Sequence, residues 1–179
     1  MAKEIFEQPE VIEQINRLYR DGSLLDQLLA LDVTRIRRIN FVACGSSFFA
    51  ASATRYWIQS MTGIECAVHV ASEYRYDPMP QVYPGEVAVL VSQSGETADT
   101  LAVLERLQHI GMPIIAIVNE MGSSMAPQAD MTLPLAAGPE IGVASTKAFT
   151  AQLVVMAHLS VHISQRRNSG AATGRLRDH

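Results

Sequence analysis

A run of small polar residues, Ser92-Gln93-Ser94-Gly95-Glu96-Thr97, stands between an apolar stretch over residues 87–91 and an amphipathic stretch over residues 98–110. The first stretch predicts a buried strand and the second a helix, so the hydroxyl groups would lie at a helix N-terminus. Free backbone amides and the positive end of the helix dipole meet there and can hold an anion without Lys or Arg. The pattern indicates a site for a phosphorylated polar ligand.

Taken alone, this run favours a plain helix cap, because Ser and Thr also cap helices when no ligand is present. A second loop changes that balance. Cys44-Gly45-Ser46-Ser47 follows an apolar strand candidate over residues 39–43 and precedes a helical run over residues 48–61. The carboxyl ends of parallel strands form one rim, so both loops can face a single crevice. Neither loop matches the stricter motifs for nucleotides or dinucleotides.

The composition excludes several classes of function. With 179 residues, 48% of them hydrophobic, and a net charge of −4, the chain predicts one soluble domain without a nucleic-acid partner. No run of 18 apolar residues and no signal peptide is present, so we expect no membrane association and a cytoplasmic location. Only Cys44 and Cys66 occur, as is typical of a reducing compartment.

The order of elements predicts an α/β fold. Further strands are expected over residues 65–70, 113–118 and 131–134, the last at an edge because it contains Pro134. Strands that alternate with helices predict a three-layer α/β/α sandwich around a roughly five-stranded parallel sheet, doubly wound as in flavodoxin. We expect an N-terminal helical segment (1–35) with a helix opening at Gln8-Pro9, a ligand-binding domain (36–165), and a linker-like tail (166–179) after a last helix over 145–164.

Four other side chains carry a possible chemistry. Cys44 is a conceivable nucleophile, but no sequence feature supplies a base, so simple packing is favoured. His158 and His162 have the spacing of a metal pair but lack a third ligand, which favours a surface or interface role. Lys147, at the start of the last helix, is either an ammonium near an anionic ligand or an ordinary solvated lysine. We therefore expect no metal ion and no cofactor.

Five blocks of the sequence resemble the first sugar-isomerase (SIS) domain of the glutamine:fructose-6-phosphate amidotransferase family, also called glucosamine-6-phosphate synthases. The resemblance extends from the start of the chain to about residue 163 and implies the SIS fold. The blocks are residues 3–9, 43–47, 72–76, 92–101 and 140–150.

The resemblance implies roles for ten residues. Residues that match Ser92, Gln93, Ser94 and Thr97 hold the sugar phosphate in that family, and those that match Cys44, Gly45, Ser46 and Ser47 line the sugar pocket. Val143 and Ser145 match positions that contact the sugar from a third loop. The family usually has Thr at the position of Ser46, and we expect the pocket to survive this change because the hydroxyl is kept.

The family's glutaminase domain and second SIS domain are not expected in this chain. The second SIS domain supplies the family's catalytic glutamate, Schiff-base lysine and ring-opening histidine. Within this chain, Glu140 precedes the third loop, but there is only modest reason to assign it as the catalytic base. The favoured function is therefore the hexose 6-phosphate or amino-sugar phosphate binding half of an isomerase or aminotransferase. The alternatives are a sensing module without chemistry and a structural dimerisation domain. We expect a homodimer, or pairing with a second SIS domain, because domains of this family pair and because the apolar helix over residues 148–159 would keep an uncovered face.

Overall fold

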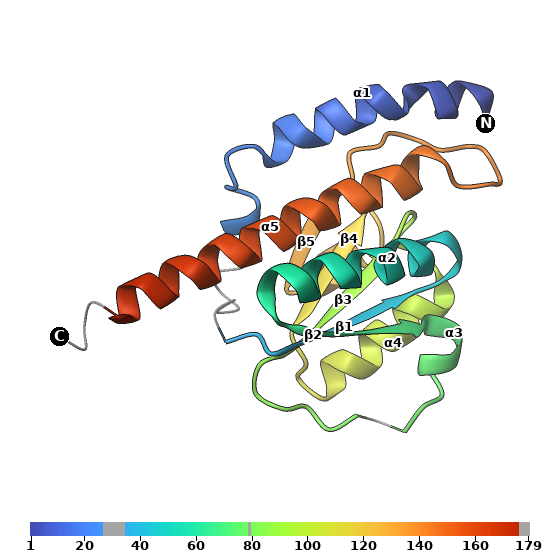
Figure 1. The fold of residues 1–179 in the computed structure, drawn as a ribbon. Helices are drawn as coiled ribbons and strands as arrows, with labels where there is room; N and C mark the ends of the chain where they lie inside the picture. The colour runs from blue at the N-terminus through green and yellow to red at the C-terminus, as the bar shows by residue number, and fades with distance from the viewer. Residues whose placement is uncertain (27–34, 79, 176–179) are drawn as a thin grey trace.

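The computed structural model describes residues 1–26, 35–78 and 80–175 of the chain (Figure 1). Five parallel strands form one sheet in the order β2-β1-β3-β4-β5. This is the flavodoxin-like order, in which ligands bind where the carboxyl ends of β1 and β3 diverge. The strands are β1 (Arg38–Ala43), β2 (Glu65–Val70), β3 (Glu86–Ser92), β4 (Ile114–Val118) and β5 (Met131–Pro134).

Helices cover both faces of the sheet, so the predicted three-layer fold is confirmed. On one face lie α2 (Gly45–Thr62) and α5 (Lys147–Arg175), and α1 (Ala2–Tyr19) runs alongside α5 (Figure 1). On the other face lie α3 (Ala71–Tyr74) and α4 (Ala98–His109), and a single turn of 3-10 helix, η2 (Ala126–Gln128), precedes β5. The prediction of an edge strand at residues 131–134 is also correct, since β5 pairs only with β4.

Alternate residues of the strands fill two hydrophobic cores, one on each side of the sheet. Ile39 and Phe41 point to the core beneath α1, α2 and α5, whereas Val42 and Leu90 point to the core beneath α4. Burial of each such side chain contributes about 1.5–3 kcal/mol, so the sheet is a rigid base for the loops at its ends.

The first helix begins at Ala2 and not at Pro9, which corrects the predicted start. A proline inside a helix has no amide hydrogen for the carbonyl four residues earlier. Here the Gln8 side chain donates from Nε2 to that carbonyl, Ile5 O, at 3.1 Å. This replacement lets the helix pass through Pro9. Leu28 and Leu29, which extend the apolar pattern of the N-terminal segment in the sequence, lie outside the described residues.

The last helix runs to Arg175, beyond the end predicted near residue 164. The composition predicted a linker from residue 166, but contacts with distant parts of the chain hold this turn of the helix. Arg166 pairs with Asp26, and Arg167 donates from Nη1 to Ile36 O at 2.7 Å. The final four residues of the expected tail, 176–179, lie outside the described residues.

Candidate functional site

The two predicted loops leave the sheet side by side. Ala43, the last residue of β1, is paired in register with Val91 near the end of β3. Cys44, which follows β1, and Ser92, which ends β3, therefore lie on neighbouring strands at the point where the strand order reverses. We call residues 92–97 the hydroxyl loop.

The hydroxyl groups of this loop bond within the loop and do not cap the helix. Ser92 Oγ lies 3.1 Å from Thr97 Oγ1 and accepts a hydrogen bond from Gly95 N at 3.0 Å. Ser94 Oγ accepts from Glu96 N at 3.1 Å. Thr97 is the N-cap residue of α4, yet its side chain makes no capping bond. The first-turn amides of α4 are therefore left without a side-chain cap, as an anion site requires.

Residues after β4 hold the hydroxyl loop from behind. Asn119 N donates to Gln93 O at 3.0 Å, and Ser124 N donates to Glu96 Oε1 at 2.6 Å. Gly95 has a φ of +67°, and a Cβ at this position would lie 2.2 Å from Ser123 Oγ. Only glycine combines this backbone conformation with so close a neighbour. Asn119 and Ser123 were not predicted as site residues. The sequence signal that could have indicated them is that they follow β4, the strand next to β3.

An ion pair offsets the one acidic residue in the first turn of α4. Arg75, just after α3, donates from Nη1 to Asp99 Oδ1 at 2.6 Å. Asp99 stabilises the helix N-terminus but would repel an anion there. The Arg75 guanidinium reduces that repulsion. Through Arg75, the sequence block over residues 72–76 therefore contacts the first turn of α4, next to the candidate site.

The first loop enters α2 without a cap. Cys44 is the N-cap residue with extended backbone angles and no side-chain capping bond, and Gly45 begins the helix with a φ of +55°. The predicted helix start at residue 48 is therefore three residues too late. Ser46 is half-buried, whereas Ser47 is buried and its Oγ accepts from Gln152 Nε2 at 2.8 Å. Gln152, on α5, is a second residue that sequence reasoning missed.

The third loop, residues 138–146, is fixed chiefly by acidic side chains. The Val143 side chain is fully exposed, and Ser145 Oγ donates to Glu140 Oε2 at 3.2 Å. Glu140 Oε1 also accepts from Thr146 N at 2.8 Å and from Ala148 N at 3.2 Å. Glu140 thus holds the start of α5 with its carboxylate, and both of its oxygens are already engaged.

Helix α1 pins the same loop from outside. Glu4 Oε1 accepts from Ile141 N at 2.6 Å and from Gly142 N at 2.9 Å. The Met1 ammonium lies 2.8 Å from Glu4 Oε2. Its hydrogen bond is the largest cause that lowers the pKa of the Glu4 carboxyl, and the two amides add to it, so that the pKa is about 2. Glu4 is another residue that was not predicted, because its partners lie 137 and 138 positions along the chain.

The structure decides against one of the two roles predicted for Lys147. The residue is 4% exposed, so it is not a solvated lysine, and its Nζ lies 2.7 Å from Glu7 Oε2 on α1. This ammonium lowers the pKa of the Glu7 carboxyl, mainly through their hydrogen bond. The charge of Lys147 therefore joins α5 to α1.

The two histidines of the last helix pack against α1 and the segment that follows it. His158 Nε2 lies 2.8 Å from Asn16 Oδ1 and its ring stacks on Tyr19, while His162 Nε2 lies 3.8 Å from Asp26 Oδ1. Within residues 1–26, 35–78 and 80–175, no cluster of three or more His, Cys, Asp or Glu could hold a metal ion. In the same part of the chain, every helix is too short or too polar to span a bilayer.

Comparison with known proteins identifies the fold family. Residues 32–162 match the family model of the SIS domain. The chain belongs to the SIS domain family. The recognition made from the five sequence blocks is therefore confirmed.

Several glutamine–fructose-6-phosphate aminotransferases (isomerizing) are similar to this SIS chain. The Zymomonas mobilis protein is 46% identical over 168 residues, and the Pseudomonas aeruginosa protein is 46% identical over 171 residues. Both alignments cover 92% of this chain but 28% of the relative, so the chain spans little more than a quarter of the length of these relatives.

A solved structure gives the same result. The C-terminal domain of glucosamine-fructose-6-phosphate aminotransferase from Francisella tularensis superposes with a TM-score of 0.86 and 41% identity. The match covers 94% of this chain and 48% of that one. The SIS fold is thus shared with a protein whose solved domain is about twice as long.

Proposed function

We propose that this chain is the hexose 6-phosphate binding part of an isomerase or aminotransferase module, of the type that converts fructose 6-phosphate to glucosamine 6-phosphate. The observation that carries the proposal is the uncapped N-terminus of α4 beneath the hydroxyl loop. The aminotransferases at 46% identity support this class of substrate.

In the proposed complex, the phosphate lies on the first-turn amides of α4 and accepts hydrogen bonds from Ser92, Ser94 and Thr97. The sugar extends towards the β1 loop, where Cys44, Gly45, Ser46 and Ser47 line its pocket. Gln93, Val143 and Ser145 complete the proposed contacts. Arg75 supports the phosphate indirectly, because it reduces the negative charge of Asp99.

Proton transfer between sugar carbons needs a base within hydrogen-bond reach of the substrate. Glu140 is held by the start of α5, and Lys147 is paired with Glu7, so neither of these two groups is free to take a proton. We therefore propose that this chain binds the substrate and that a second SIS domain, or a second copy of the chain, completes the active site. A cytoplasmic location is part of the same proposal.

Calorimetric titration with fructose 6-phosphate and glucosamine 6-phosphate tests the binding site. A Ser94→Ala, Thr97→Ala variant loses two hydrogen bonds to a charged group, each worth about 1.5–3 kcal/mol, so we expect binding to weaken at least a hundredfold. Ser60→Ala is the matched control, since this hydroxyl lies near the other end of α2 and, among the described residues, bonds Trp57 O alone.

An isomerisation assay on the same samples separates binding from chemistry. We expect binding without turnover. Turnover by the chain alone would reveal a catalytic base within the chain itself. Equal binding by the double variant and the Ser60→Ala control would contradict the proposed phosphate site, and binding that no added SIS domain converts to turnover would favour a sensing module.

A further inference from the structure

A buried polar residue lies within the sheet, on the side that α4 covers. Asn40, near the middle of β1, is 6% exposed and is paired in register with Ala67 on β2 and Ala88 on β3. Side chains in register on neighbouring strands share a face, so two small methyl groups flank the Asn40 amide. Among the described residues, no side chain or carbonyl bonds this amide. This face of the sheet therefore carries a buried amide without a protein partner among the described residues.

The Asn40 amide lies at the floor of a cavity of about 400 Å³, which Pro78, Pro80 and Tyr83 also line. His69 and Tyr74 also line it, with their rings 4.4 Å apart, and Asp77 and Glu86 supply acceptors. Burial lowers the pKa of the His69 imidazole and so favours its neutral form. The lining offers both donors and acceptors of hydrogen bonds, as is typical of a site for a polar molecule.

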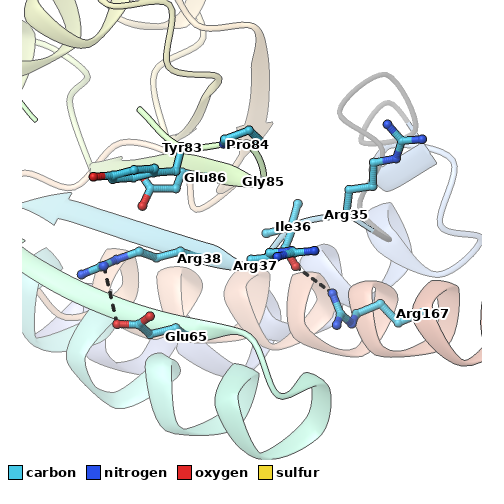
Figure 2. A pocket seen from close by; sticks show the side chains of 10 residues that line it. All are labelled: Arg35, Ile36, Arg37, Arg38, Glu65, Tyr83, Pro84, Gly85, Glu86 and Arg167. Atoms are coloured by element: carbon cyan, nitrogen blue, oxygen red, sulfur yellow. Dashed lines mark hydrogen bonds and ion pairs between the residues drawn. The ribbon is translucent and has the colours of Figure 1, made fainter. Parts of the chain in front are cut away.

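A second cavity, of about 830 Å³, adjoins the first at the amino ends of β1, β2 and β3 (Figure 2). The two share Arg38, Tyr83 and Glu86. Four arginines and two glutamates line the larger cavity, which gives it an excess of two positive charges. In Figure 2 one glutamate is paired with Arg38, at 3.6 Å, and Arg167 bonds Ile36 O. The arginines are Arg35, Arg37, Arg38 and Arg167.

Two residues that line these cavities each have a buried nitrogen without a partner. In the part of the chain that the structure describes, neither Arg38 Nε nor His69 Nε2 makes a hydrogen bond. A buried polar group without a partner costs about 1–3 kcal/mol, and a ligand that supplies the partner would recover this energy. With the Asn40 amide, three polar groups of the residues that line the two cavities therefore lack a hydrogen-bond partner among the described residues.

We propose that the two adjoining cavities form one binding site for a small polar anion, at the end of the sheet opposite the hydroxyl loop. The anionic group lies at the arginines, because guanidinium groups hold phosphate and carboxylate through paired hydrogen bonds. The hydroxyl- or amine-bearing part of the ligand lies on Asn40 and His69. This site is separate from the sugar-phosphate site and does not rest on the proposed function.

NMR spectra of the ¹⁵N-labelled chain, titrated with adenosine monophosphate, inorganic phosphate and citrate, test this site. We expect adenosine monophosphate, which carries both parts of the ligand, to shift the amide signals of Asn40 and His69 and to leave Gly95 unchanged. Phosphate and citrate serve to distinguish a phosphoryl from a carboxylate preference. Either preference supports the site, provided that the same amide signals move.

Two variants locate the binding. Arg37→Gln removes an exposed guanidinium, and Asn40→Leu fills the floor with an apolar side chain; each should weaken binding about tenfold, as the loss of one charge-assisted or buried hydrogen bond implies. Arg17→Gln, an exposed arginine of α1 paired with Glu13, is the control and should bind normally. Arg37→Gln decides the result if Asn40→Leu does not fold.

The inference is overturned if none of the three probes shifts these amide signals, or if Arg37→Gln binds as well as Arg17→Gln. It is also overturned if the probes move only Gly95 and its neighbours and lose this effect in Ser94→Ala. That last outcome would leave the proposed sugar-phosphate site intact, so the failure of one site is distinguishable from the failure of the other.

Discussion

Single residues decide the shape of the hydroxyl loop, and Gly95 is the clearest case. Its positive φ alone costs an L-residue about 1–2 kcal/mol, and overpacking adds about 1–3 kcal/mol. Gly63, the C-cap of α2, has a similar φ of +70° but nothing within 4 Å of a Cβ position, whereas at Gly95 a Cβ would meet Ser123 Oγ at 2.2 Å. Substitution of both glycines by alanine therefore separates the cost of the strained backbone, which both share, from the cost of crowding, which only Gly95 has of the two.

We predict that Gly95→Ala lowers the free energy of unfolding by about 3 kcal/mol and Gly63→Ala by about 1 kcal/mol. Chemical denaturation measures both values. Gly95→Ala should also weaken fructose 6-phosphate binding, because Ser123 can be relieved only if the loop moves. Equal losses of unfolding free energy in the two variants would show that the Ser123 side chain can move aside while the loop stays in place.

Glu4 makes stability depend on pH. Its pKa in the folded chain, about 2, is below the ordinary value of 4.5, so its contribution is complete above pH 4.5 and is lost as the pH falls towards 2. We predict that Glu4→Gln has a lower Tm than the unmodified chain at pH 7, and that the difference narrows below pH 4.5.

Thermal unfolding across this pH range measures the effect. Glu10→Gln is the control, since Glu10 is an exposed residue of the same helix. The difference in Tm between Glu10→Gln and the unmodified chain should not narrow below pH 4.5. A difference between Glu4→Gln and the unmodified chain that stays constant from pH 7 to pH 3 would contradict the role given to the carboxylate charge.

At the scale of elements, the ion pair between Glu7 and Lys147 joins α1 to α5. Lys147 Nζ is nearly enclosed, with 6% of its side chain exposed, whereas the Glu7 side chain is 27% exposed. Removing the carboxylate leaves a buried ammonium without a partner, while removing the ammonium leaves a carboxylate that water can reach.

We therefore predict that Glu7→Gln lowers the Tm more than Lys147→Met, and that the double variant is no less stable than Lys147→Met. Thermal unfolding of the four proteins forms a double-mutant cycle. The exposed pair Glu13 and Arg17 is the control and should show nearly additive effects. Additive effects at Glu7 and Lys147 would contradict the coupling.

The sequence predicted elements better than contacts between elements. Strand β3 and the hydroxyl loop were foreseen because hydrophobic periodicity and turn residues are local signals. The bonds from Glu4 to Ile141 and from Gln152 to Ser47 span 137 and 105 positions, and they depend on how α1 and α5 pack, which no periodicity encodes. For the same reason the end of α5 was placed too early: Asp26 and Ile36, its partners, are remote in sequence.

At the scale of the whole molecule, the surface available for self-association differs from the one expected. The apolar stretch of α5 between Ala148 and Leu159 was expected to keep an uncovered face, but α1 and α2 flank it, and Ala148, Met156 and Leu159 are fully buried. Among the exposed apolar side chains of the described residues, one group lies on α2. Phe49 and Tyr56 are 64% and 60% exposed, and their spacing of seven positions puts them on one face of the helix.

We predict that the chain forms a dimer through this face of α2, since exposed apolar patches of this kind mark interaction surfaces. Sedimentation velocity over a wide range of concentration should show a monomer–dimer equilibrium, which shifts to monomer in a Phe49→Ser, Tyr56→Ser variant. Phe6→Ser, which removes an 83% exposed aromatic ring from α1, is the control and should still dimerise. Dissociation by Phe6→Ser alone would assign the interface to α1, and a monomer at every concentration would leave the α2 face for a second SIS domain.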